Sequence, residues 1–158
     1  AVQFEYPALR LEMTSVIARE LREKVKDVTV VDPLRVVKYQ EQNIYWDSMD
    51  KTELGRTLGA DYVLLVSVID FRGREPSGTN VFRGRAVAEA SLYKTSLPER
   101  RARLRRYEDL RVTYPPGGLP EAPAGESRDV RYKTEQLLAQ TIVRKFYKHK
   151  APAGEEAS

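Results

Sequence analysis

The chain lacks cysteine and has a single histidine among its 158 residues. Without cysteine there can be no disulfide, thiolate metal site or cysteine nucleophile. The histidine, His149, follows the last expected helix, where exposure is more usual than general-base catalysis. Neither a P-loop spacing nor a cluster of metal ligands occurs along the sequence. We therefore predict no catalytic residue, no cofactor and no metal site, and we do not expect an enzyme.

Long apolar runs are missing too. The longest is shorter than the roughly 20 residues that span a bilayer. Residues 1–6 have neither the basic start nor the apolar centre of a signal peptide, so we expect the sequence to begin after a removed leader. The net charge of +4 fits either weak attraction to anionic partners or simply a well-solvated surface.

The most apolar stretch, residues 58–71, reads L-G-A-D-Y-V-L-L-V-S-V-I-D-F. Gly59 is placed to end a helix, because glycine readily adopts the positive φ of a helix C-cap. The following residues are apolar at both odd and even positions. This pattern predicts a central strand that is covered on both faces.

Periodicity assigns the other elements. Asp32-Pro33 is a helix-start signal, and Ala86, Ala88 and Ala90 form a row that lets a helix approach a sheet closely. Helices are predicted at residues 7–26, from 32 to about 41, 50–58 and 127–148, and further strands at 28–31, 81–95 and 101–114. The last of these strands alternates imperfectly, which indicates a bulge or an edge position.

This order of elements predicts an α/β fold with a mixed four-stranded sheet. The first two strands are separated by helices and should be parallel, whereas the later strands should form an antiparallel meander. The first and last helices would cover one sheet face and the crossover helices the other. We expect a single α/β domain over residues 1–150 and a disordered tail over residues 151–158.

Arginine is concentrated around the predicted hairpin. The candidate partner- or anion-binding residues are Arg83, Arg85, Arg100, Arg101, Arg103, Arg105 and Arg106. If the two strands pair, the first two arginines should face the other five, and the patch could bind phosphate, anionic polysaccharide or an acidic protein surface. With Tyr93 and Tyr107 it could stack single-stranded nucleic acid. Alternatively, the neighbouring acids Glu89, Glu99, Glu108 and Asp109 would pair with the arginines across strands.

A second candidate is the aromatic pair Tyr45 and Trp46, in a segment that contains the only tryptophan. The pair would form either a ligand-stacking surface or an anchor that holds a loop on the core. Anchoring is the more usual role of large aromatic side chains.

Several of these features together resemble a family. They are V-V-D-P after the first strand, E-L-G-R-T-L-G-A-D-Y-V-L-L-V-S-V, a strand ending A-S-L-Y, and a closing helix. The series resembles bacterial envelope domains related to the TolB amino-terminal domain, curli-secretion channel subunits and Pel-type export lipoproteins. The resemblance implies an exported protein, often lipid-anchored through an amino-terminal cysteine, that binds partners or assembles into rings without catalysis.

The resemblance implies a non-catalytic protein that acts with envelope proteins or an anionic polymer in secretion, polysaccharide export or cell-wall work. It would be periplasmic and outer-membrane-anchored, and would contact membrane only through a lipid anchor upstream of Ala1. The alternative is a cytoplasmic nucleic-acid-binding module that uses the arginine-rich hairpin. A third hypothesis is a homo-oligomer assembled through exposed strand edges.

Overall fold

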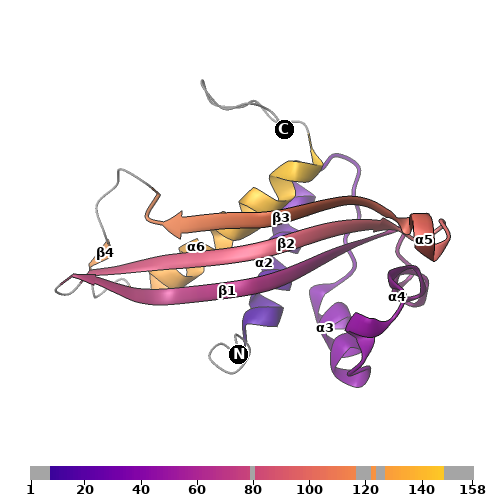
Figure 1. Cartoon of the computed structure of the whole chain (residues 1–158), viewed down its shortest axis with the longest axis horizontal. Helices are drawn as coiled ribbons and strands as arrows, with labels where there is room; N and C mark the ends of the chain where they lie inside the picture. Colours follow the sequence, from indigo (N-terminus) through magenta and orange to yellow (C-terminus); the bar gives the residue numbers. More distant parts are fainter. Residues whose placement is uncertain (1–7, 79–80, 117–121, 124–126, 148–158) are drawn as a thin grey trace.

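A computed structural model describes residues 8–78, 81–116, 122–123 and 127–147. Within these residues the sheet consists of β1 (Tyr62–Gly78), β2 (Val81–Lys94) and β3 (Arg103–Tyr114), antiparallel and in that order (Figure 1). The two-residue strand β4 (Ala122–Pro123) pairs with the start of β2. The predicted combination of helices with an antiparallel meander is therefore confirmed.

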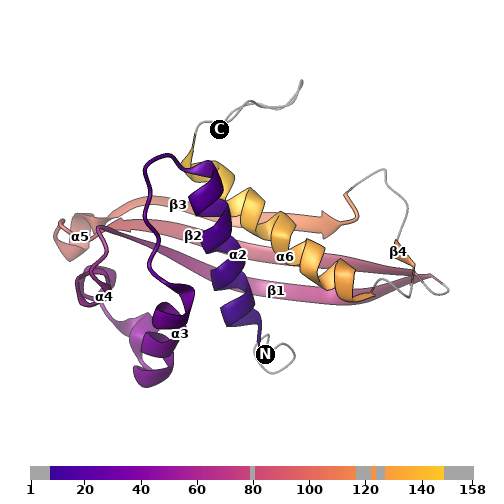
Figure 2. The ribbon, with the colours of Figure 1, turned by 180° about the vertical axis from the view of Figure 1, so that it is seen from behind.

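Two long helices cover one face of this sheet (Figure 2). They are α2 (Leu9–Lys24) and α6 (Ser127–Val143), and α6 continues into the 3-10 turn η3 (Arg144–Phe146). No helix among the described residues combines the length and the hydropathy needed to cross a membrane.

The helix α6 lies close against the sheet at β2. Ala86, Ala88 and Ala90 are at most 1% exposed, as the sequence pattern predicted. At Gly84 an added methyl group would overlap the Thr134 hydroxyl of α6 and lie 2.9 Å from its Cβ. Small side chains on β2 thus bring α6 onto the sheet, where Leu138 and Ile142 are fully buried.

The remaining helices lie at one end of the sheet, as Figure 1 shows. They are α3 (Pro33–Gln42), the 3-10 turn η1 (Trp46–Ser48), α4 (Lys51–Leu58) and α5 (Glu99–Ala102). Their caps follow the sequence signals. Asp32 accepts a hydrogen bond from the Leu34 amide at 3.0 Å, and Gly59 ends α4 with φ +69°.

The prediction of a strand at residues 28–31, and with it the parallel pair, is wrong. This segment is an irregular connection between α2 and α3, and it pairs with no described strand. Asp27 has φ +58°, so the chain turns directly after α2, and Val28 is left 38% exposed. The valine run was too short for its β propensity to outweigh the absence of a neighbouring strand.

The prediction that residues 62–71 form a central strand covered on both faces is also wrong. β1 pairs only with β2 and is an edge strand among the described residues. The crossover helices lie at the end of the sheet, and α4 covers only its first residues: an added methyl group at Gly55 would lie 3.0 Å from Val63. Farther along, Ile69 sits at a bulge and is 55% exposed.

The predicted irregularity of the last strand is confirmed, since β3 is an edge strand with a bulge at residues 108–109, where Asp109 has φ +56°. The segment predicted to begin this strand at residue 101 instead includes the short helix α5. His149 and the tail at residues 151–158 lie outside the described residues.

Candidate functional site

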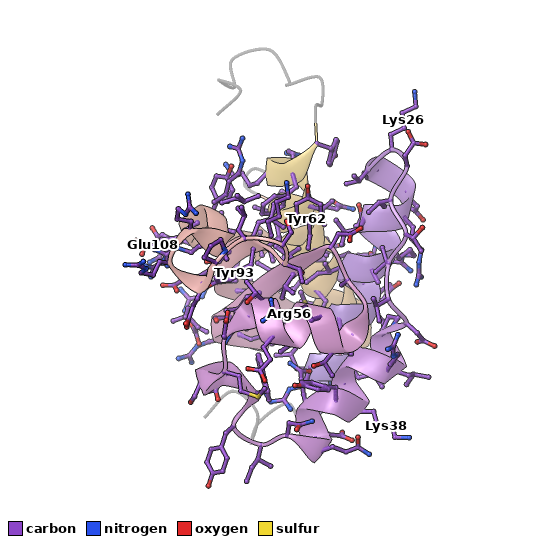
Figure 3. All side chains as sticks on the ribbon, turned by 90° about the vertical axis from the view of Figure 1, so that its right-hand side faces the viewer. Lys26, Lys38, Arg56, Tyr62, Tyr93 and Glu108 are labelled. Carbon is purple, nitrogen blue, oxygen red and sulfur yellow. The ribbon has the colours of Figure 1, made fainter. Side chains whose placement is uncertain are left out.

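One face of the sheet is turned away from α2 and α6, and we call it the open face. The strand registers place Ser67, Asp70, Arg72, Arg85, Val87, Glu89, Ser91, Tyr93, Arg103, Arg106, Arg111 and Thr113 on it. Figure 3, seen from the α5 end, shows Glu108 on one side of the molecule and Lys26, just beyond α2, on the other. A partner could therefore contact the open face beyond α4 without displacing α2 or α6.

The candidate arginines are not one patch. Arg103 and Arg106 pair in register with Tyr93 and Ser91, whereas Arg85 pairs with Thr113. The six positions from Arg85 to Ser91 on β2 correspond to about 20 Å. The two strands do form the predicted pair, but the expectation that Arg83 and Arg85 face the later arginines is wrong, because antiparallel pairing brings them to opposite ends.

The later arginines also divide between elements. Arg100 and Arg101 are exposed on α5 and, like Arg103, make no ion pair with a described residue. Arg105 pairs in register with Leu92 on the helix-covered side, where its guanidinium donates to the Tyr107 hydroxyl at 3.4 Å. A register shift at Leu104 places Arg103 and Arg105 on opposite faces of the sheet, which a simple alternation could not have shown.

Acidic side chains pair with several arginines of the open face. Arg106 lies 2.8 Å from the Glu108 carboxylate and 3.7 Å from that of Glu89 on the neighbouring strand. Arg111 lies 2.6 Å from Asp109. Only the Arg106–Glu89 contact joins two strands, whereas the two shorter contacts lie within β3. Acids therefore pair with these arginines mainly along one strand and not across strands. Because the partners are exposed, each pair contributes at most about 1 kcal/mol to stability.

A shallow pocket of about 180 Å³ lies on the open face near α5. Its lining consists of Leu65, Ser67, Glu89, Ser91, Tyr93, Arg103 and Arg106. It combines two guanidinium groups, hydroxyl groups and one aromatic ring with the Glu89 carboxylate, which lies 3.7 Å from Arg106, so Arg103 is the guanidinium most able to bind an acidic group.

The aromatic pair separates into two roles. Trp46 is partly buried, with Arg10 of α2 and Lys51 of α4 each 5.9 Å from its ring centroid. Tyr45 is 73% exposed, and Ile44 beside it is 72% exposed. This geometry supports the anchoring role for Trp46.

The buried side chain of Lys51 is hydrogen-bonded to the same loop. Its ammonium group donates to the carbonyl oxygens of Asp47 at 2.7 Å and Met49 at 2.8 Å. Burial lowers the pKa of Lys51, because removal from water disfavours the charged form, while Asp47 and Asp50 oppose this shift.

The sequence patterns did not identify a second concave site, a groove of about 560 Å³ between α2 and α6. It is lined by Leu11, Glu12, Ser15, Val16, Arg19, Arg131, Tyr132 and Glu135. Glu12 accepts from Arg131 at 2.7 Å, and Arg19 donates to the Tyr132 hydroxyl at 3.1 Å. The volume falls within the range of small-molecule sites, but the groove is open to solvent and most of its lining residues are polar or charged, whereas such sites are mostly apolar.

Glu135 forms the floor of this groove and is only 2% exposed. Burial, followed by the hydrogen bond and negative charge of Glu12, raises its pKa to about 8, and Arg131 opposes the shift. One signal in the sequence could have revealed this residue. Glu135 stands three and seven positions before Leu138 and Ile142, so it is a charged residue within the buried stripe of a helix.

Among the described residues, no three histidine, cysteine or acidic side chains are grouped so as to hold a metal ion. Comparison with protein-family models, curated proteins and solved structures gave no match to this chain. Functional inference therefore depends on the two sites themselves, the open face and the groove.

Proposed function

We propose that the chain is a non-catalytic bacterial envelope protein that binds a partner protein through the open face of its sheet. The observation that carries the proposal is that this face has no helix over its middle and far end in the described residues, yet its charges alternate in sign. A surface of alternating charge selects partners by complementary pattern. The envelope location and a role in secretion, polymer export or cell-wall work derive from the sequence resemblance.

The TolB-like finer fold is part of this proposal. It is supported by the helix-to-strand transition in L-G-A-D-Y-V-L, where Gly59 ends α4 in the left-handed conformation and β1 begins at Tyr62. The closing helix α6, packed beside α2 on one sheet face, adds further support.

The face suits a partner better than the sheet edges do. β1 is interrupted by register shifts between Val68 and Asp70 and between Arg72 and Glu75. β3 presents a dense row of charged residues and a bulge at Asp109. Bulges and charges both oppose edge-to-edge strand pairing, so homo-oligomerisation through these edges has less support than binding at the face.

An acidic protein surface also fits better than a uniformly anionic polymer. Glu89, Glu108 and Asp109 would repel a continuous row of phosphates or carboxylates, whereas Arg103 and the α5 arginines offer a local positive corner. Separate acidic side chains of a partner could contact Arg103 and the α5 arginines without approaching Glu89, Glu108 or Asp109.

Nucleic-acid binding is the second candidate, since the pocket combines Tyr93 with Arg103 and Arg106. Tyr107, the other tyrosine expected to stack on bases, lies on the helix-covered side of the sheet. Tyr107 makes an edge-to-face contact with Phe146, with ring centroids 5.6 Å apart. A single tyrosine leaves the expected stacking platform incomplete.

The test is site-specific photo-crosslinking in cells that natively express the full-length protein. A photoreactive residue at Thr113 or Arg103 on the open face should give discrete adducts in the envelope fraction. The same residue at exposed Arg22 on α2 is the control and should give none. Equal adducts from all positions would contradict the proposal.

A binding assay separates the two candidates. Anisotropy with a labelled 20-nucleotide RNA should show no sub-micromolar binding at physiological salt. Tight RNA binding with a steep salt dependence, lost in Arg103→Glu/Arg106→Glu but kept in Arg22→Glu, would establish the nucleic-acid alternative instead.

A further inference from the structure

The groove between α2 and α6 lies on the helix layer, so it is separate from the open face (Figure 2). Its lining combines apolar and polar side chains. Leu11, 36% exposed, and Val16 give it an apolar part, while Glu12, Arg131 and Glu135 gather at its polar part.

One oxygen in the polar part lacks a hydrogen-bond donor. Glu135 Oε1 is buried and makes no hydrogen bond with a described residue, although Arg131 Nε lies 3.5 Å away. A buried acceptor without a donor is unfavourable, because it loses its hydrogen bonds to water and gains none in return. A ligand that donates a hydrogen bond to this carboxyl group after a small adjustment of the groove would remove that cost.

The charges define which ligand fits. The charged or titratable groups that line the groove with Glu135 are Glu12 and Arg19 of α2 and Arg131 and Tyr132 of α6, among the described residues. The Arg131 charge is balanced by Glu12, 2.7 Å away, while Arg19 is held by the Tyr132 hydroxyl. With Glu135 protonated, the Glu12–Arg131–Glu135 cluster is neutral, and loss of that proton leaves the cluster with one negative charge, which a cation beside it can offset. Arg19 keeps its own positive charge next to the neutral Tyr132 hydroxyl.

We infer that this groove binds a primary ammonium or guanidinium group on a short apolar stem, which exchanges with the proton of Glu135. The cation donates hydrogen bonds to Glu135 and Glu12, the stem lies along Leu11 and Val16, and the proton goes to solvent. A divalent metal fits less well, because two carboxylates beside a guanidinium supply too few oxygen ligands.

The experiment is isothermal titration calorimetry of the whole chain with n-butylamine and n-butylguanidine at pH 6.5 and pH 8.5. Binding should be roughly tenfold or more tighter at the higher pH, because the ligand replaces a proton held with a pKa near 8. Buffers of different ionisation enthalpy should report about one proton released per ligand at pH 6.5 and roughly a quarter of a proton at pH 8.5, where Glu135 is already mostly ionised. Binding that is independent of pH, or no binding, would overturn the inference.

Two further probes test the recognition itself. n-Butyltrimethylammonium carries the same charge without a hydrogen-bond donor and should bind at least tenfold more weakly, so equal affinity would overturn the inference. An acetylated and amidated Gly-Lys-Gly peptide compares sources of the amine. Tighter binding than n-butylamine assigns the groove to a partner's lysine side chain, and weaker binding assigns it to a free amine.

Matched variants complete the test. Glu135→Gln should abolish both binding and proton release, whereas Glu23→Gln at an exposed position of α2 should change neither. Circular dichroism checks that the variants fold, and Glu12→Gln provides a second loss-of-binding variant if Glu135→Gln does not fold. Unchanged amine binding in either folded groove variant would overturn the inference.

Discussion

The two faces of the sheet are made by alternate residues of the same strands, yet they differ in almost every property. The covered face carries Ala86, Ala88 and Ala90 of β2 and Phe71 of β1, each at most 1% exposed. The open face carries Arg85, which directly precedes these alanines in sequence and is exposed to solvent. The contrast shows how one strand with a two-residue period can build a core and display a surface.

The two faces therefore contribute very differently to the stability of the fold. Packing on the covered face removes apolar area from water, which contributes about 25 cal/mol per Å². The exposed ion pairs on the open face contribute little. Substitutions should therefore affect stability on one face and binding on the other.

The largest effect is expected for Phe71→Ala on the covered face. Removing this fully buried ring leaves a cavity under α6 and should lower the free energy of unfolding by about 3–5 kcal/mol. Its neighbour Arg72 is exposed on the open face, so Arg72→Ala should cost below about 1 kcal/mol. Urea denaturation measures both, and similar losses would contradict the division between faces.

Gly84→Ala should have the next largest effect. The added methyl group would overlap the Thr134 hydroxyl, so α6 must move away from β2, at a cost of about 1–3 kcal/mol. Thr134→Ala removes the overlapping oxygen and should relieve part of that cost in the double variant. Additive losses in the double-mutant cycle would rule out this contact as the cause.

Glu135→Gln should change the pH dependence of stability. The folded pKa of about 8 lies above the unfolded value of 4.5, so the folded state holds the extra proton between them and stability falls as pH rises through this window. From pH 6 to pH 9 the wild type should lose on the order of 2 kcal/mol relative to Glu135→Gln. Glu23→Gln should retain the wild-type slope, and a wild-type slope in Glu135→Gln would show that Glu135 is not the titrating group.

The smallest effect is expected on the open face. The Arg106–Glu108 pair, 2.8 Å long but 44% and 60% exposed, should show a coupling energy below about 1 kcal/mol in a double-mutant cycle. The coupling should disappear near 1 M salt, because exposed charges are screened. A larger, salt-resistant coupling would mean that this face contributes to stability as the covered face does.

Much of the covered face could be read from the sequence. Ala86, Ala88 and Ala90 predicted close helix packing, and residues 127–148 were predicted as the closing helix, most of which the structure contains as α6 and η3. The candidate sites were harder to read. The arginines were visible, but their separation depends on the direction of pairing and on the register shift at Leu104, and both are set only when the strands pair with one another.

The sequence by itself determined the local structure of this protein: the Asp32 cap, the Gly59 stop, and the small residues that let α6 approach the sheet. These depend on groups a few residues apart, whose chemistry a local pattern contains. Only the tertiary structure decided that β1 is an edge strand, that one sheet face is open, and that Glu12 meets Glu135 across 123 positions of chain. Such outcomes depend on which distant surfaces bury each other, and periodicity within one segment carries no information about its partner.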